Sequence, residues 1–367
     1  MKVALVYDRV NKWGGAERVL LVLHELFPNA PLYTSVYNSK KTKWAEVFNV
    51  KTSFLQRFPN ATDKHEFYAP FMPHAFESFS FDGYDLVISV TSEAAKGIMT
   101  KPKTKHICYC LTPTRYLWSG YDEYFSNRIL RSLSKPVVSY LRRWDKIASK
   151  RPDKYIAISK EVQKRIKKYY GKESEVIYPP VTLADAGDSH LPHVAKGSHN
   201  KYFLIVSRMV PYKRVDIAIK AFNKLKLPLK IVGTGVEEKR LKKIAMSNIE
   251  FLGNLTDMEL LRYYKGSSAL VFPTNEDFGL AILEAQMFGK PVIAFRKGGA
   301  LETIIDGKTG EFFYPQHEDA LIKTLQGFIG KKYKISDCIK QAEKFNKERF
   351  KQQFLESINR FFREIKK

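Results

Sequence analysis

The sequence predicts an α/β protein with two doubly wound domains, because strand-like and helix-like segments alternate in two successive series. In each series, short apolar runs typical of buried strands precede segments with apolar residues at helical spacing. A stretch without periodicity, rich in Gly, Asp, Ser, His and Lys, separates the two series. We therefore expect a first domain over residues 1–181, a linker over 182–200, a second domain over 201–345 and a final helix over 346–367.

The first series begins with the apolar run Val3–Tyr7, which reads as a strand, and a helix is expected after it over residues 15–27. A basic helix is expected after residue 159, and Pro179-Pro180 ends the last strand of the series. The other expected strands of this domain are the apolar runs at residues 85–90, 106–110, 155–159 and 175–178.

The second series repeats the alternation, and repeated βα units imply parallel sheets. Its expected strands are residues 202–207, 229–232, 249–252, 269–272 and 292–295. Its expected helices begin near residue 212, span about 237–246 and 256–264, and begin again at Gly279. The final helix carries an apolar stripe, which predicts that it packs against another surface. The stripe consists of Phe350, Phe354, Ile358, Phe361 and Phe362.

The composition suits two globular domains with full cores, since the chain has 367 residues of which 44% are hydrophobic. No apolar stretch approaches the roughly 20 residues that span a bilayer. The run Met1–Asp8 is too short for a signal peptide and ends in an acid. Three cysteines form no disulfide or metal pattern, which favours a reducing compartment. We expect a cytoplasmic protein.

The charge is strongly basic, with 62 Lys and Arg against 38 Asp and Glu, a balance of +24. Residues 128–168 hold 14 basic and three acidic residues, a local net charge of +11. No nucleic-acid-binding motif is present, so we do not expect nucleic acid as a partner. We interpret the patch, with the aromatic residues just before it, as a peripheral contact with an anionic membrane. Solvated helix faces of a Lys-rich protein are the open alternative. The aromatic residues are Tyr116, Trp118, Tyr121, Tyr124 and Phe125.

Two carboxylates flank a Phe-Gly step that is expected to open a helix in the second domain. Glu276 lies in the loop after the strand, and Glu284 lies in the second turn of the helix. The first turn of a helix has unpaired N–H groups that attract an anion, here the amides of residues 278–280. Carboxylates would repel a nearby phosphate, so their presence is explained if they bind polyol hydroxyls instead. A nucleotide sugar supplies both the phosphates and the hydroxyls. Alternatively, both acids are ordinary charges of a helix surface.

Other loops at the carboxyl ends of expected strands carry glycines or cations. Arg208 and Lys213 follow the first strand of the second domain, where a guanidinium and an ammonium could stabilise a diphosphate leaving group. Gly14-Gly15 opens the first helix of the chain and lets the backbone approach a phosphate. Gly233-Thr234-Gly235 and Lys297-Gly298-Gly299 follow two further strands. Each motif alone is compatible with a simple turn, but their convergence favours a nucleoside diphosphate.

Together these motifs resemble glycosyltransferase family 4, whose members are retaining enzymes of the GT-B fold. The fold consists of two Rossmann-like domains that face each other across a cleft, with a C-terminal helix that crosses back to the N-terminal domain. The resemblance extends over nearly the whole chain. It rests on Gly14-Gly15-Ala16-Glu17-Arg18, Ser207-Arg208 with Lys213-Arg214, Glu276 with Phe278-Gly279-Leu280 and Glu284-Ala285, Gly289-Lys290-Pro291-Val292 and Gly298-Gly299.

The resemblance implies roles for individual residues. Arg208 and Lys213 bind the donor diphosphate and stabilise it as it leaves, and Glu276 contacts the hydroxyls of the transferred sugar. Glu284 holds the ribose hydroxyls. Backbone contacts to the sugar and the phosphates come from Phe278, Gly279 and Leu280, and from Gly14 and Gly15 of the first domain. No metal is expected, since no suitable Asp-x-Asp segment is present and the cations can do the electrostatic work.

Residues 84–116 are similar to a subgroup of bacterial mannosyltransferases for O-antigen and exopolysaccharide. Leu111 stands where this subgroup usually has histidine, and Ser92 stands at a second position often held by histidine. Leucine cannot form a hydrogen bond, so acceptor handling must differ. Leu111 and Arg115 are the candidate acceptor-side residues. The remaining histidines nearby, His65, His74 and His106, could substitute, and none is singled out.

We expect a retaining hexosyltransferase without a cofactor. GDP-mannose is the first candidate donor, a UDP-hexose is the second, and the acceptor is a glycan or lipid-linked oligosaccharide at the cytoplasmic face of the membrane. Two alternatives stay open from the sequence. One is a nucleotide-sugar epimerase of the same fold, and the other is a non-catalytic basic binding protein.

Overall fold

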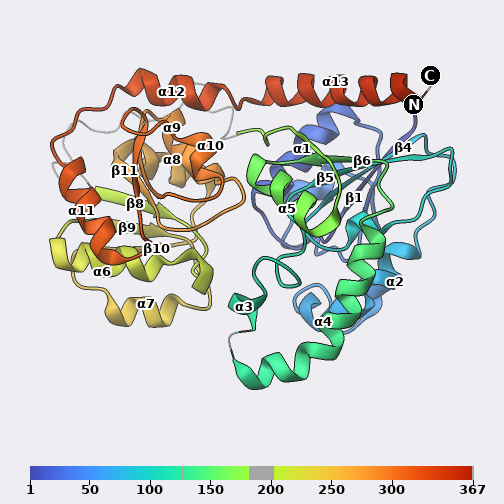
Figure 1. Cartoon of the computed structure of the whole chain (residues 1–367), viewed down its shortest axis with the longest axis horizontal. Coiled ribbons are helices and arrows are strands. Elements are labelled where there is room, and N and C mark those ends of the chain that lie inside the picture. The colour runs from blue at the N-terminus through green and yellow to red at the C-terminus, as the bar shows by residue number, and fades with distance from the viewer. Residues whose placement is uncertain (126, 182–201, 366–367) are drawn as a thin grey trace. The chain divides into compact units, whose positions relative to one another are not determined.

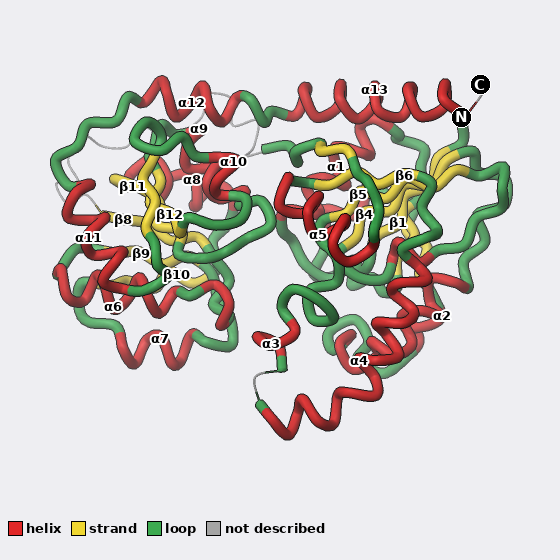
Figure 2. Tube along the Cα trace, viewed as in Figure 1, coloured by secondary structure: helices red, strands yellow, loops and turns green. Residues whose placement is uncertain are grey.

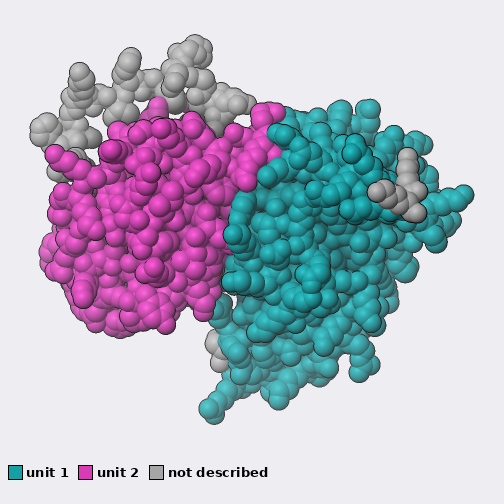
Figure 3. Space-filling view, turned by 45° about the horizontal axis from the view of Figure 1, so that its top comes forward, with its two compact units in different colours: residues 1–180, 350–367 teal, residues 181–349 magenta. Residues whose placement is uncertain are grey.

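The computed structural model describes residues 1–125, 127–181 and 202–365. These residues divide into two compact units, one of residues 1–180 with 350–367 and one of residues 181–349 (Figure 3). Each unit is built on a parallel sheet with helices packed around it (Figures 1 and 2). The expected linker, residues 182–200, lies outside the described residues.

The first unit contains a seven-stranded sheet in the order β3-β2-β1-β4-β5-β6-β7, and every neighbouring pair is parallel. The strands are β1 (Val3–Tyr7), β2 (Leu32–Thr34), β3 (Val50–Thr52), β4 (Leu86–Thr91), β5 (Lys105–Cys110), β6 (Lys154–Ala157) and β7 (Glu175–Val176). The five strands expected from the apolar runs are confirmed to within a few residues. The short strands β2 and β3 were not predicted.

Helices of very different length accompany this sheet. They are α1 (Gly15–Leu26), α2 (Met72–Glu77), α3 (Tyr121–Tyr124), α4 (Arg128–Ala148) and α5 (Lys160–Tyr170). Short 3-10 helices are η1 (Lys43–Val47), η2 (Phe54–Arg57), η3 (His65–Phe71) and η4 (Ala95–Gly97). The long helix α4 was not predicted. Its N-cap residue is Asn127, whose side chain accepts hydrogen bonds from the amides of Ile129 and Leu130.

The last helix, α13 (Lys347–Ile365), packs on the first unit. The rings of Phe350 and Phe354 lie 5.8 and 5.9 Å from the ring of Tyr109 in β5. At the other end, Glu175 accepts hydrogen bonds from Ser357 at 2.7 Å and from Arg360 at 2.5 Å. The apolar stripe therefore has the packing role expected from the sequence, and the return of the final helix to the first unit is confirmed.

The second unit contains a six-stranded parallel sheet in the order β10-β9-β8-β11-β12-β13. The strands are β8 (Tyr202–Val206), β9 (Leu229–Val232), β10 (Ile249–Gly253), β11 (Ser267–Phe272), β12 (Val292–Phe295) and β13 (Gly310–Phe313). The helical elements are η5 (Pro211–Lys213), α6 (Val215–Leu225), α7 (Glu238–Ile244), α8 (Asp257–Gly266), α9 (Leu280–Met287), α10 (Ala300–Thr303), α11 (Glu318–Phe328) and α12 (Ile335–Glu343).

Alternation of side chains along each strand divides the core of the second unit between the two sheet faces. Ile231 and Phe222 belong to one buried cluster, and Leu270 and Ile282 belong to the other. In both sheets the strand order reverses next to the first strand, between β1 and β4 and between β8 and β11. Ligands of open α/β sheets bind at the carboxyl ends of the strands at such a reversal. The two edges at these reversals are therefore the places to look for a site.

Candidate functional site

At the reversal in the second unit, Lys213 of η5 forms an ion pair with Glu276 of the loop between β11 and α9. The ammonium nitrogen contacts Oε1 of the carboxylate, and the two side chains are 10% and 23% exposed. An ion pair this deeply placed is only weakly screened by solvent. Two charges predicted from separate sequence motifs therefore meet at one point of the sheet edge.

Arg208 completes a chain of contacts around this pair. Its guanidinium donates a hydrogen bond of 2.6 Å to the hydroxyl of Tyr212, and the Lys213 ammonium lies 5.4 Å from the centre of the Tyr212 ring. Thr274 donates a hydrogen bond of 3.3 Å to the Tyr212 carbonyl, which joins the η5 segment to the Glu276 loop. Arg208 itself is exposed, so its guanidinium is accessible to a ligand.

The loop from Glu276 ends at the N-terminus of α9 as the sequence predicts. Gly279 precedes the helix with a φ of 89°, a left-handed conformation that favours glycine, and no side chain caps the helix there. Leu280 is the first helical residue. The Phe278 ring is buried and lies 5.7 Å from the ring of Phe345. Its side chain thus anchors the loop, and only its backbone could serve a ligand.

Glu284 is 6% exposed in the second turn of α9. The hydroxyl of Tyr264, which is fully buried, donates a hydrogen bond of 2.7 Å to Oε2 of this carboxylate. A buried carboxylate must be well satisfied, so Glu284 is not the ordinary surface charge that the sequence left open.

The glycines at this sheet edge are required because neighbouring loops leave no room for a side chain. A Cβ at Gly298 would collide with the carbonyl of Glu276, and a Cβ at Gly299 would collide with the backbone of Phe278. The Gly299 amide donates a hydrogen bond of 2.9 Å to that same Glu276 carbonyl. A Cβ at Gly233 or Gly235 would likewise strike the backbone of the Arg208 loop. These glycines let neighbouring loops touch, and so hold Glu276 and Arg208 in place.

The remaining predicted donor residues, Gly14 and Gly15, belong to the first unit. Gly14 precedes α1 without a side-chain cap, and Gly15 is the first residue of that helix. Behind this turn, Tyr7 donates a hydrogen bond of 2.6 Å to the buried carboxylate of Glu17. Burial and the negative charge of Glu17 raise the pKa of Tyr7 well above its ordinary value, so the phenol stays protonated.

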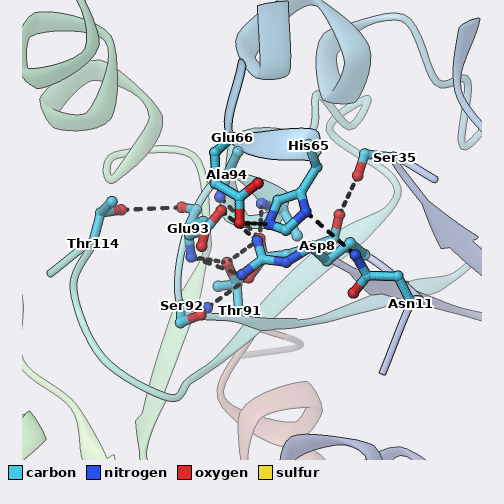
Figure 4. Close-up of polar contacts among 12 residues, drawn as sticks. Asp8, Asn11, Ser35, His65, Glu66, Thr91, Ser92, Glu93, Ala94 and Thr114 are labelled. Carbon is cyan, nitrogen blue, oxygen red and sulfur yellow. Dashed lines mark hydrogen bonds and ion pairs between the residues drawn. The ribbon is translucent and has the colours of Figure 1, made fainter. Parts of the chain in front are cut away.

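At the reversal in the first unit, Asp8 joins the ends of β1 and β4 (Figure 4). Its carboxylate is 4% exposed and accepts a hydrogen bond from the Thr91 hydroxyl at 2.8 Å. It also accepts from the amides of Ser92, Glu93, Ala94 and Ala95 at 2.7 to 3.1 Å. So many donors compensate its burial, and they fix the backbone that follows β4.

Beside Asp8, Arg9 donates to Glu93 at 2.6 Å, and the two side chains are 13% and 22% exposed. His65 lies in the same cluster (Figure 4). Burial and the positive charge of Arg9 lower the pKa of His65 to about 4, so the imidazole is neutral at neutral pH. Asn11 donates to the Thr62 carbonyl at 2.9 Å and lies 3.3 Å from Nδ1 of His65. If Nδ1 accepts from this amide, the neutral ring carries its proton on Nε2.

Two polar atoms of this cluster have no hydrogen-bond partner among the described residues, although both are buried. They are Nε of Arg9, a donor, and Oδ1 of Asn11, an acceptor. Orphaned buried groups are costly, and they are expected where a ligand or water completes the site. A hydroxyl group can serve either kind of atom.

The two positions that depart from the family's histidines lie at this same edge. Thr91 and Cys110 are register partners at the ends of β4 and β5, and Ser92 and Leu111 are the residues that follow them. The Leu111 amide donates to the Thr91 carbonyl at 2.8 Å, and Arg115 lies farther along the same loop. Of the three histidines that could substitute, His106 is fully buried within β5 and His74 is exposed on α2, whereas His65 lies in the cluster.

Among the described residues, no group of three or more His, Cys, Asp or Glu side chains is arranged to hold a metal ion. No helix in this part of the chain is long and apolar enough to span a bilayer.

Comparison with known sequences recognises one domain of the chain. Residues 190–345, which include all the donor-side residues of the second unit, match the family described as Glycosyl transferases group 1. The chain carries a group 1 glycosyltransferase domain. An uncharacterized glycosyltransferase of Methanocaldococcus jannaschii is 32% identical over 46% of this chain and 47% of its own length. The D-rhamnosyltransferase WbpZ of Pseudomonas aeruginosa is 27% identical over 56% of both chains.

The O-antigen chain mannosyltransferase C of Escherichia coli is 27% identical over 51% of both chains. The chain thus spans about half the length of the curated relatives that it matches. The solved structure of Anabaena HepE in complex with UDP and glucose covers 98% of this chain and 99% of its own, with a TM-score of 0.72 and 22% identity. This similarity shows the GT-B fold, so the fold expected from the sequence motifs is confirmed. The match of residues 190–345 agrees with the resemblance to glycosyltransferases.

Sequence reasoning missed Arg9, Asn11 and Glu93 of the first unit. A signal for Arg9 and Glu93 was present in two apolar runs that were recognised as strands. Asp8-Arg9 directly follows the first run, and Ser92-Glu93 follows the second one residue later. Polar residues after a strand were used as a clue in the second domain and could have been used in the first.

Proposed function

We propose that this chain is a retaining hexosyltransferase that uses a nucleoside diphosphate sugar, with GDP-mannose as the first candidate donor and a UDP-hexose as the second. The observation that carries the proposal is the Lys213–Glu276 ion pair at the carboxyl edge of the sheet in a group 1 glycosyltransferase domain. An ordinary surface salt bridge has no need to lie at the carboxyl edge of the sheet. A donor site there needs a cation for the diphosphate and a carboxylate for the sugar hydroxyls, side by side.

The proposed roles follow from charge. Lys213 and Arg208 bind the diphosphate and offset the charge that develops as it departs, which lowers the barrier to transfer. Glu276 accepts hydrogen bonds from hydroxyls of the transferred sugar, and Glu284 accepts from the ribose. The backbone of Phe278, Gly279 and Leu280 contributes donors at the uncapped start of α9. Gly14 and Gly15 are proposed to offer backbone amides to the phosphates.

The names of two relatives support a sugar of the mannose configuration. One is an O-antigen mannosyltransferase and the other is a D-rhamnosyltransferase, and D-rhamnose is 6-deoxymannose. Both relatives match over about half of the chain, and the fold neighbour HepE holds UDP and glucose. UDP-hexoses therefore belong in the first experiment alongside GDP-mannose.

For the acceptor, we propose a hydroxyl of a glycan or lipid-linked oligosaccharide, handled at the cytoplasmic face of the membrane. The orphaned atoms of Arg9 and Asn11 supply a donor and an acceptor for such a hydroxyl. The Glu93 carboxylate and the neutral His65 lie in the same cluster. Leu111 and Arg115 are proposed to border this acceptor position. The cluster would replace the histidine that the family places at residue 111.

A thermal-shift panel of GDP-mannose, UDP-glucose, UDP-galactose and UDP-N-acetylglucosamine tests the donor site. A ligand that binds only the folded state raises the melting temperature by mass action. We expect one donor to stabilise the wild type and to lose its effect in Lys213→Met. The matched control is Lys239→Met, an exposed lysine of α7. No shift with any donor, or the same loss in both variants, would contradict the proposal. Release of an epimerised nucleotide sugar without an acceptor would identify an isomerase instead.

A further inference from the structure

The long helix α4 exposes an apolar stripe that the fold of the first unit does not cover. Ile129 and Leu133, one helical turn apart, are 72% and 74% exposed, and Ile147 near the other end is 54% exposed. Val137 and Tyr140 lie between them on the same side and are also exposed. Large apolar side chains aligned over the length of one helix form a contiguous patch, and such a patch marks an interaction surface.

Basic residues border this stripe, and no exposed carboxylate of α4 opposes them. Arg128, Lys135, Arg143 and Lys146 are exposed. The single acid of the helix, Asp145, is buried in an ion pair of 2.5 Å with Lys96. Among the described residues, no ion pair or hydrogen bond engages the side chains of Arg128, Lys135 or Arg143. The outer face of α4 therefore combines apolar side chains with uncompensated positive charge.

The inner face holds α4 in place without help from the stripe. Val138 and Leu141 are buried in a small cluster with Leu117, and Asp145 accepts hydrogen bonds from Trp118 at 2.7 Å and from Thr114 at 3.2 Å. Trp144 also donates a hydrogen bond of 2.8 Å to Glu77 of α2, a helix that lies beside α4 in Figure 1. Because these contacts fix the helix, its outward apolar residues are not needed for folding.

Most of the aromatic residues before α4, which the sequence suggested as part of a membrane contact, face the fold and are partly buried. Tyr116, Trp118, Tyr121 and Phe125 pack against the cluster under α4, and Trp118 stacks on Tyr169. Their position after a strand end and before a basic segment could not distinguish an inward from an outward orientation. Tyr124 is the exposed member of the group.

We propose that the outer face of α4 is a docking surface for an anionic bilayer, with the helix axis in the plane of the interface. The stripe of Ile129, Leu133, Val137, Tyr140 and Ile147 enters the boundary between headgroups and acyl chains, and the bordering cations contact lipid phosphates. This inference extends the membrane contact in the proposed function by assigning it to defined residues. It does not depend on the identity of the donor.

Charge complementarity favours a bilayer over other occupants. A second copy of this helix would bring its own arginines and lysines against those of the first, and like charges repel. Nucleic acid would engage the cations but would leave the aliphatic stripe in water. An anionic bilayer matches both features of this face. Its lipid phosphates can contact the cations, and its acyl chains can contact the apolar stripe.

Co-sedimentation with vesicles tests the surface. At about 0.1 M salt we expect binding to vesicles of phosphatidylglycerol and phosphatidylcholine, and much weaker binding to phosphatidylcholine alone. The double variant Ile129→Gln/Leu133→Gln should bind at least tenfold more weakly. Lys135→Gln/Arg143→Gln should lose about fivefold for each residue. The matched controls Val236→Gln and Lys239→Gln/Lys243→Gln, all exposed in the second unit, should bind like the wild type.

Unchanged binding of both α4 variants would overturn the proposal, as would wild-type protein that does not bind anionic vesicles. Equal losses in the α4 variants and their controls would also contradict it, since this would show a non-specific charge effect. Melting temperatures close to that of the wild type would show that the variants remain folded.

A fluorescent probe reports insertion directly. The three native cysteines, Cys108, Cys110 and Cys338, are buried, so a single cysteine introduced by Leu133→Cys can be labelled selectively with an environment-sensitive dye. Anionic vesicles should shift its emission to the blue, whereas the same dye at Val236→Cys should not respond. A shift at both positions, or at neither, would contradict the assignment.

These outcomes are independent of catalysis. Failure of vesicle binding with intact donor-induced stabilisation would reject the α4 surface alone. Normal vesicle binding without donor binding would reject the proposed function alone.

Discussion

The ammonium of Lys213 contacts the carboxylate of Glu276, although the two residues belong to different βα loops of the second sheet. Their loops are also joined by a hydrogen bond from Thr274 to the Tyr212 carbonyl. The Gly299 amide, from the loop after β12, donates to the Glu276 carbonyl. In the absence of a donor the two charges neutralise each other. A diphosphate can take over the lysine, and the hydroxyls of a sugar can take over the carboxylate.

Replacing Glu276 by Gln should lower the rate of transfer about 10²- to 10³-fold, the effect of removing one well-placed electrostatic group from a reacting site. The amide keeps the shape of the side chain but removes the charge, so the fold should be retained. Initial rates with saturating donor and acceptor, together with the melting temperature, measure both effects. The same substitution at Glu238, on α7, provides a control. A Glu276→Gln enzyme with wild-type activity would remove Glu276 from the mechanism.

Gly299→Ala should destabilise the protein by about 1–3 kcal/mol, because the new methyl group would collide with the backbone of Phe278. The displaced loop should also weaken donor binding. Chemical denaturation and donor titration measure the two effects. The matched control is Gly327→Ala in α11, where a Cβ meets nothing within 4 Å. That change should be neutral or stabilising by up to about 1 kcal/mol. Equal stability of the two variants would show that the close approach at Gly299 has no importance.

Glu93→Gln should reduce transfer about 10- to 100-fold while leaving donor binding unchanged, because it weakens a charged hydrogen-bonding group on the acceptor side. A split between a lowered transfer rate and an intact donor-induced thermal shift is the diagnostic result. Glu77→Gln, which weakens the contact with Arg151 elsewhere in the same unit, is the control for a general loss of structure. Loss of donor binding in Glu93→Gln would place this carboxylate on the donor side instead.

The stability of the protein should fall below about pH 6.5 through His106. Burial and the positive charge of Arg151 lower the pKa of this histidine to about 3, and its Nε2 lies 2.8 Å from the Ser89 hydroxyl. Between the two pKa values the unfolded chain binds the proton and the folded chain does not, so stability is complete above about pH 6.5 and declines as the pH falls toward 3.

The slope due to one such histidine is about 1.4 kcal/mol per pH unit. Denaturation between pH 7 and pH 5 should show a shallower slope in His106→Gln than in the wild type. Ser89→Ala removes the hydroxyl but not the burial, and should keep the slope. Parallel pH profiles for the wild type and His106→Gln would contradict this account.

Much of the fold could be predicted because the long, buried strands are continuous apolar runs. Val3–Tyr7 and Leu86–Thr91 are buried at every position, and such strands are visible without an alignment. The short strands Leu32–Thr34 and Val50–Thr52 have only three residues each, too few to show a period.

The helix α4 could not be predicted for a different reason. Its core-facing side includes a buried Asp145, it contains Pro136, and its exposed side carries isoleucine and leucine. Its apolar pattern is thus set partly by a surface that no part of the described fold covers. Local sequence rules assume that apolar residues face a core, and here some of them do not.

For the site, the charged residues could be predicted, but the reason for the glycines could not. Gly298 and Gly299 suggested close approach to a phosphate, whereas the structure shows close approach to the backbone of residues 276–278. A glycine in the sequence indicates a close approach to the backbone, and only the fold shows whether a ligand or another segment of the chain approaches. The Arg9–Glu93 pair depends on contacts over 84 residues of chain, which spacing along the sequence does not reveal.

The measurement that tests the central claim most directly compares the free nucleoside diphosphate with the nucleotide sugar as calorimetric ligands. Lys213→Met should weaken both ligands by tenfold or more, because it removes a contact to the shared diphosphate. Glu276→Gln should weaken only the nucleotide sugar and should leave the free diphosphate bound as tightly as in the wild type, or more tightly, since it removes a neighbouring negative charge. If both substitutions changed the two affinities equally, or changed neither, Lys213 and Glu276 would not divide the donor between them, and the proposed site would be wrong.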